Sequence, residues 1–139
     1  MQFSTAALAA ILSASTVFAA PVAIPSWTLT SFKRVCNTAD TSCTWTFGVN
    51  PNTGAAVTPV KYVVKGSPAS QTDFTVPTTF GAYTVTAGWS GQFGPGNGFT
   101  TLAVANNAIK QIAYPAYTDA ELAGGKVVTP NKSWAVTQM

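Results

Sequence analysis

The segment WTLTSFKRVCNTADTSCTWTFGV, residues 27–49, decides the fold of this chain. Its second half alternates large with small or polar side chains, the pattern of a strand with one buried and one solvated face. The threonines on the solvated face are themselves good strand formers. The positions predicted to be buried are Cys43, Trp45, Phe47 and Val49.

The first half of the same segment predicts the partner strand of a hairpin. In a regular strand, Trp27 and Leu29 would share one face and Phe32 would lie on the other. A β-bulge, or a strand that serves two sheets, would reconcile the three positions. Cys36 and Cys43 enclose the polar or small residues of the turn, so they can close the hairpin.

Residues 1–19 have the composition of a secretory signal peptide. They contain no charged side chain, and an apolar run at 6–12 is followed by Val17 and Ala19, which fit cleavage after Ala19. A membrane anchor is the alternative, but this run is shorter than the roughly 20 residues that a spanning helix needs. We therefore expect a secreted, extracellular β domain at residues 20–139, which is enough chain for one core.

Secretion determines how the two cysteines are interpreted. In an oxidising compartment an isolated pair is most simply a disulfide, so Cys36 and Cys43 are predicted to be bonded. Two cysteines without any histidine cannot build the usual tetrahedral metal site. The glycines of segment 88–98 lack the following lysine and helix of a phosphate-binding loop. We predict neither a metal nor a cofactor.

The charge pattern argues against a nucleic-acid or lipid partner. Seven basic and four acidic residues give a net charge of +3. The basic residues are dispersed, whereas nucleic-acid or membrane binding favours clusters. The excess positive charge is explained by solubility.

The rest of the chain predicts an all-β fold. Strand patterns occur at 57–65, 74–76, 81–89, 99–104, 108–114 and around Trp134. Pro77 excludes a central position in a sheet for its own strand, and a capping-box pattern predicts at most a short helical turn at 118–122. Seven to nine short strands at this spacing predict a single small antiparallel β-barrel or β-sandwich.

The residue inventory argues against an enzyme. The chain has no histidine, which excludes a Ser-His-Asp triad and a Cys-His pair. A glycosidase needs two carboxyl groups facing each other at roughly 5–9.5 Å. Asp119 and Glu121 are better explained by helix capping, and Asp40 by bonds to nearby backbone N–H groups. An Asp40–Asp73 pair is the remaining catalytic alternative.

Exposed aromatic rings are the best candidates for a binding surface. Trp89 and Phe93 border the glycine-rich segment 88–98, where they either fold back on the end of the domain or face a ligand or receptor. Trp45 is expected in the core because it alternates with Phe47. Asn131-Lys132-Ser133 is a sequon for N-glycosylation at Asn131.

The pattern W-x-L-x-x-F-x-R-x-C-x-x-x-D-x-x-C-x-W-x-F-x-V, at residues 27–49 behind a signal peptide, resembles fungal small secreted proteins. More narrowly, it is similar to the hypersensitive-response-inducing elicitors of plant-pathogenic fungi. The resemblance implies a small β-barrel or β-sandwich exported to the apoplast, where a host plant perceives it and responds with defence signalling and localised cell death. It covers the first hairpin and the general size and layout beyond it.

Two hypotheses follow. In the first, the protein is a non-enzymatic effector or elicitor read by a host plant receptor or another apoplastic protein. In the second, it is a binding or structural protein associated with the wall or a wall glycan at the fungal cell surface. The sequence predicts no oligomeric state.

Overall fold

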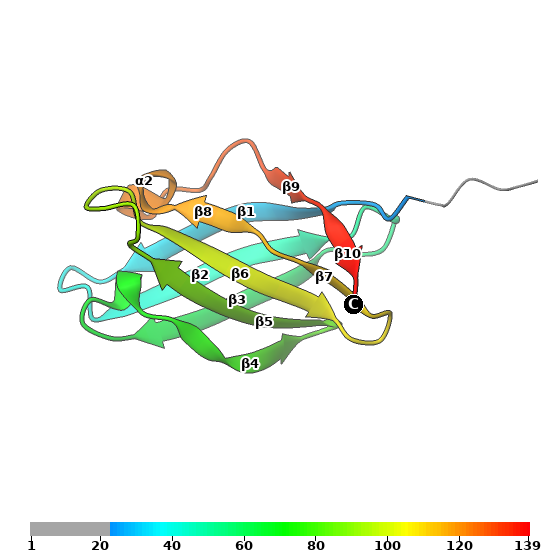
Figure 1. The fold of residues 1–139 in the computed structure, drawn as a ribbon, viewed down its shortest axis with the longest axis horizontal. Coiled ribbons are helices and arrows are strands. Elements are labelled where there is room, and N and C mark those ends of the chain that lie inside the picture. The colour runs from blue at the N-terminus through cyan, green and yellow to red at the C-terminus, as the bar shows by residue number, and fades with distance from the viewer. Residues whose placement is uncertain (1–22) are drawn as a thin grey trace, which may run out of the picture.

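In the computed structural model, which describes residues 23–139, two antiparallel sheets pack against each other around one core (Figure 1). Of the two predicted architectures, the structure has the sandwich, because its strands form two separate sheets. Among the described residues, no helix is long and apolar enough to cross a membrane. The predicted signal peptide, residues 1–19, lies outside the described part of the chain.

The four-stranded sheet has the order β3-β2-β1-β9, and the larger sheet has the order β10-β7-β6-β5-β4, with β8 also paired to β6. The strands of the first are β1 (Trp27–Cys36), β2 (Ser42–Asn50), β3 (Thr58–Lys65) and β9 (Lys132–Trp134). Those of the second are β4 (Phe74–Phe80), β5 (Tyr83–Ser90), β6 (Phe99–Asn106), β7 (Gln111–Ala113), β8 (Ala116–Thr118) and β10 (Val136–Gln138). The helical segments are η1 (Ala69–Gln71), α2 (Asp119–Leu122) and η2 (Ala123–Gly125).

Of the two explanations offered for β1, the β-bulge is the one that the structure has. Its pairing with β2 shifts register between Thr30 and Lys33, and Ser31 has a φ of 50°. The extra residue turns the strand over, so that Trp27, Leu29 and Phe32 are all buried. The bulge therefore lets β1 bury its large side chains both before and after the register shift.

Alternation in β2 and β3 builds the inner face of the smaller sheet, and the buried set predicted for β2 is confirmed. Cys43, Trp45, Phe47 and Val49 of β2 are buried. In β3, Val60, Tyr62 and Val64 are buried, and the residues between them are exposed. Pro77 lies in β4, the edge strand of the larger sheet, which confirms its predicted exclusion from a central position.

Aromatic stacking joins the two sheets. Phe32 of β1 stacks on Tyr117 of β8 with ring centroids 3.8 Å apart. Tyr62 of β3 stacks on Phe74 of β4 at 4.1 Å. Each contact links a strand of one sheet to a strand of the other, and buried aromatic pairs contribute beyond their area.

Two strand predictions need correction. The strand expected at 108–114 contains only β7, because residues 107–110 form a turn in which Lys110 has a φ of 56°. The strand expected around Trp134 is two strands, since the chain leaves one sheet at Trp134 and enters the other at Val136. The described residues thus form ten strands rather than seven to nine.

Candidate functional site at the disulfide end

Four segments that are far apart in the sequence meet at one end of the sandwich, on the left in Figure 1. They are the Cys36–Cys43 loop, η1, the glycine-rich loop at 91–98, and α2. Contacts between polar side chains join them: Asp40 binds Ser70, Arg34 binds Asp119, and Trp89 binds Asp119. We call the five residues Arg34, Asp40, Ser70, Trp89 and Asp119 the disulfide-end network.

The hairpin loop is fixed by the disulfide and by one asparagine. Cys36 and Cys43 are register partners in β1 and β2, and their sulfurs are bonded. The Asn37 side-chain oxygen accepts hydrogen bonds from the backbone N–H groups of Thr41 and Ser42, at 2.8 and 3.1 Å. Together these contacts hold the loop so that Asp40, with a φ of 53°, faces η1.

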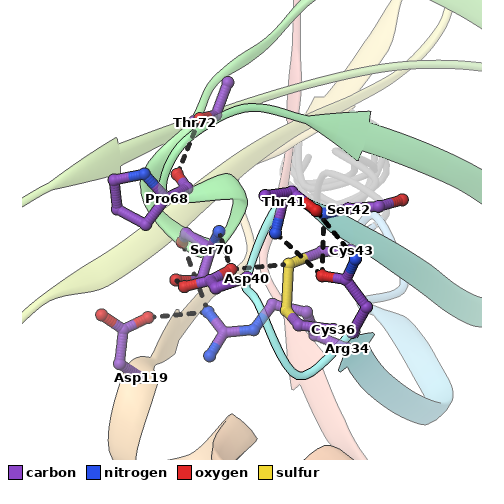
Figure 2. The surroundings of a disulfide bond; sticks show 11 residues. Arg34, Cys36, Asp40, Thr41, Ser42, Cys43, Pro68, Ser70, Thr72 and Asp119 are labelled. Carbon is purple, nitrogen blue, oxygen red and sulfur yellow. Dashed lines mark hydrogen bonds and ion pairs between the residues drawn. A yellow bond between two sulfur atoms is a disulfide. The ribbon is translucent and has the colours of Figure 1, made fainter.

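Asp40 binds a partner far along the chain instead of the local backbone expected from the sequence. Its Oδ1 accepts from the Ser70 backbone N–H at 2.9 Å, and its Oδ2 accepts from the Ser70 hydroxyl (Figure 2). The Asp40 carbonyl also accepts from the Ala69 N–H at 2.8 Å. Asp40 therefore anchors η1 to the disulfide loop.

Arg34 is a buried cation paired with a carboxylate. Only 8% of the residue is exposed, and its Nη1 donates to Asp119 Oδ1 at 2.9 Å (Figure 2). The guanidinium carbon also lies 5.6 Å from the ring centroid of Trp45, within cation–π range. A buried charge requires such compensation, so Arg34 holds α2 against the end of β1.

Asp119 joins this ion pair to the glycine-rich loop. Trp89 Nε1 donates to Asp119 Oδ2 at 2.9 Å, so each carboxylate oxygen has a donor. The backbone N–H of Asp119 donates to the carbonyl of Gly98 at 2.9 Å. An added Cβ on Gly98 would lie 2.5 Å from Asp119 Oδ2, so the loop can approach this closely only with glycine there.

Two hollows lie on either side of this contact. One of about 360 Å³ is lined by Arg34, Asp40, Ser70 and the glycines of η2. The other, also about 360 Å³, lies between Trp89, Asp119 and the glycine-rich loop. The network therefore lies between two hollows whose linings mix polar and apolar groups.

The carboxylates are occupied in ways that hold the structure together. Glu121 closes the predicted capping box of α2 with Thr118 and pairs with Lys132. Burial raises the pKa of Glu121, but hydrogen bonds from Lys132 and Thr118 outweigh it and leave that pKa below its ordinary value. Asp73 accepts from the backbone N–H of Trp89 at 2.8 Å. Asp40 and Asp73, the remaining candidate pair for catalysis, thus engage different partners.

The disulfide removes the thiolate ligands from a cluster that could otherwise bind a metal, which is formed by Cys36, Asp40 and Cys43. Their ligand-type atoms lie within 4.8 Å of one another. The two sulfurs are bonded to each other, so neither offers the thiolate that binds a metal.

The three remaining candidate residues occupy different environments. Phe93 is 66% exposed and stacks on Phe99 with centroids 5.7 Å apart. Trp89 is half-buried, and its indole N–H is used by Asp119, so only Phe93 presents a largely free ring. Asn131 is exposed, and its side-chain oxygen accepts from the Ser31 N–H at 3.0 Å in the bulge of β1.

Sequence reasoning missed Arg34 and Ser70. Arg34 carried a usable signal, because after the bulge it shares the inward face with Phe32 and a buried cation needs an anion. Ser70 carried none, since its role depends on a fold that brings η1 to the hairpin loop.

Comparisons with known proteins match nearly the whole described chain. A family model described as "Effector TSP1" matches residues 28–139. A curated protein named "Effector TSP1", from the fungus Hypocrea virens, is 49% identical over 143 aligned residues, which cover 97% of each chain.

Proposed function

The chain belongs to the Effector TSP1 family, and from that membership we propose that it is a secreted fungal effector that a host plant perceives. In this proposal the signal peptide at 1–19 exports the protein to the apoplast. A host receptor or apoplastic protein then recognises its folded surface, and the plant responds with defence signalling or hypersensitive cell death. The observation that carries the proposal is the family match over residues 28–139.

The chemistry of the site supports recognition without catalysis. The chain has no histidine, and the carboxylates at the disulfide end accept hydrogen bonds from Ser70, Arg34 and Trp89. Networks of this kind hold loops in one geometry. A protein recognised by shape needs such rigid loops, because a preorganised surface binds with less entropic cost.

Infiltration of purified residues 20–139 into leaves tests the proposal. We expect ion leakage and defence-gene induction on a responsive host, and no loss of either in an Asp40→Asn or Asp73→Asn variant that remains folded. Absence of any response across a panel of hosts would contradict the proposal. If the unmodified protein hydrolysed a polysaccharide, and if an Asp40→Asn or Asp73→Asn variant lost both that activity and the leaf response, the non-enzymatic part of the proposal would be contradicted.

One observation favours the second hypothesis, a protein associated with wall glycans. Phe93 presents a largely exposed ring on the glycine-rich loop, and sugars stack on such rings. Fractionation of a fungal culture separates the two functions. The effector proposal predicts protein in the culture filtrate, whereas retention on the wall, reduced by Phe93→Ala, would favour the glycan-associated function.

A further inference from the structure

The outer face of the four-stranded sheet carries a row of two lysines on either side of a threonine. Lys33 of β1 pairs with Thr46 of β2, and Thr46 pairs with Lys61 of β3. Because neighbouring strands lie about 4.8 Å apart, the backbones of the two lysines are about 9.5 Å apart. The fold therefore places two lysines in one row on the same face of the sheet.

An apolar groove of about 560 Å³ lies beside this row. Lys33 and Lys61 line it together with Val57, Pro59 and Val127. Strand β2 lines the groove at Gly48, where an added Cβ would lie 2.6 Å from a methyl carbon of Val57. Strand residues of the sheet and the loop residues Val57 and Val127 thus form the groove together, with Lys33 and Lys61 among its lining.

The same face exposes more apolar surface than a solvated sheet requires. Val35 and Val63 stand in the next row outward, on either side of Thr44. With Val57 and Val127 they make four valines that are 40–46% exposed. Two of them, Val57 and Val127, line the groove, and exposed apolar side chains gathered in this way mark interaction surfaces.

The cations of this face have no acidic neighbour on it. Among residues 23–139 the ion pairs are Arg34–Asp119 and Lys132–Glu121, so Lys33 and Lys61 are unpaired there. The outward positions of β1, β2 and β3 contain no Asp or Glu. Lysine and proline on the edge strand β3 also discourage strand pairing, but this explains neither Lys33 on an inner strand nor the valines.

We propose that this face is a docking surface for an acidic protein segment of the host. The segment places carboxylates against Lys33 and Lys61 and an apolar side chain in the groove beside them. The inference rests on the proposed effector function and names the chemistry of the partner. Complementary charge favours an acidic occupant, whereas a second copy related by two-fold symmetry would bring lysines against lysines.

Apolar contacts distinguish a protein partner from an anionic glycan. Protein interfaces combine an apolar centre with charged or polar groups around it, which is the layout of the valines and lysines here. A polyuronate would need the lysines alone. Binding of polygalacturonate that depends on Lys33 and Lys61 but survives Val57→Ser/Val127→Ser would therefore overturn the proposal in favour of a glycan.

An NMR titration tests the surface directly and without a host. The probe is a capped Glu-Val-Val-Glu peptide, and the control is its neutral isostere Gln-Val-Val-Gln. With the acidic peptide we expect saturable chemical-shift changes at the groove residues, which are Lys33, Thr46, Val57, Lys61 and Val127. The binding affinity should be at least tenfold weaker for the neutral peptide, and equally so for the acidic peptide with the Lys61→Glu protein. Equal binding of both peptides, no saturable shift, or shifts centred on the disulfide end would overturn the proposal.

A leaf assay tests whether this surface is used. Lys33→Glu/Lys61→Glu should raise the dose for a half-maximal response about tenfold or more, because steering charges change association rates by that much. Lys33→Arg/Lys61→Arg should retain the response. Lys110→Glu is the charge control for the single variant Lys61→Glu, because both change the net charge by the same amount. Lys110 lies on a turn of the other sheet, so Lys110→Glu should retain the leaf response.

The leaf assay and the peptide titration together distinguish failure of the docking surface from failure of the effector function. A full response from the folded Lys33→Glu/Lys61→Glu variant overturns the docking surface while the effector function stands. A wild-type protein that elicits nothing on any host contradicts the effector function, and the peptide titration then decides the surface alone.

Discussion

At the scale of single residues, Arg34 is the side chain on which the disulfide end depends most. It is buried, and among residues 23–139 its one carboxylate partner is Asp119. Asp119→Ala should lower the free energy of unfolding by about 3 kcal/mol, because it leaves the buried Arg34 guanidinium without its anion. Urea denaturation measures the loss.

The second ion pair provides the control for this prediction. Lys132 and Glu121 are both more exposed than Arg34, so Lys132→Met should cost less than about 1 kcal/mol. Equal losses for the two variants would contradict the special role of Arg34.

Glu121 makes the stability depend on pH in a defined direction. Its pKa in the folded state is lowered from 4.5, so its ionised form stabilises the fold. That contribution is complete above the unfolded-state pKa and is lost as the pH falls through the lowered folded-state value. Glu121→Gln should therefore flatten the acidic limb of a plot of unfolding free energy against pH. An unchanged limb would show that other groups produce it.

At the scale of elements, the hairpin of β1 and β2 is closed by the disulfide. Closing a loop of this length removes unfolded-state entropy worth about 2.5 kcal/mol. Cys36→Ser/Cys43→Ser should lose about that much stability in urea. Mass spectrometry of unreduced secreted protein should find both thiols protected from alkylation, and free thiols there would contradict the pairing.

The glycine-rich loop depends on the absence of a side chain at Gly98. Gly98→Ala would force a Cβ against Asp119 and Trp89, so it should alter the fluorescence of Trp89 and cost about 1–3 kcal/mol. Gly88→Ala is the control, because its Cβ would meet only Asp73 Oδ1 at 3.8 Å. Identical spectra for the two variants would refute the close contact.

The elements that the sequence predicted best are those with regular alternation. The strand at 43–49 and the buried set of β3 follow directly from a period of two, and the β1 bulge from the conflict between Leu29 and Phe32. The predicted strand at 108–114 is longer than the observed one, because composition does not reveal the positive φ of Lys110. The division at Ala135 depends on which sheet each three-residue strand joins, which is a tertiary property.

At the scale of the whole molecule, the candidate site could be predicted only in part. The cysteine pair lies close in sequence, so its bond followed from inventory and compartment. The contacts of Asp40 with Ser70 and of Arg34 with Asp119 span 30 and 85 residues. Such pairs arise from the packing of two sheets and have no local signature.

The central claim is that a host recognises the folded protein, and one measurement tests it most directly. Leaf responses are compared over a dose series for native residues 20–139 and for the same protein reduced, alkylated and shown by circular dichroism to be unfolded. We predict that the native protein elicits ion leakage at doses where the unfolded sample elicits none. An unfolded sample that elicits as strongly as the native one would contradict the claim, because recognition would then rest on a linear peptide.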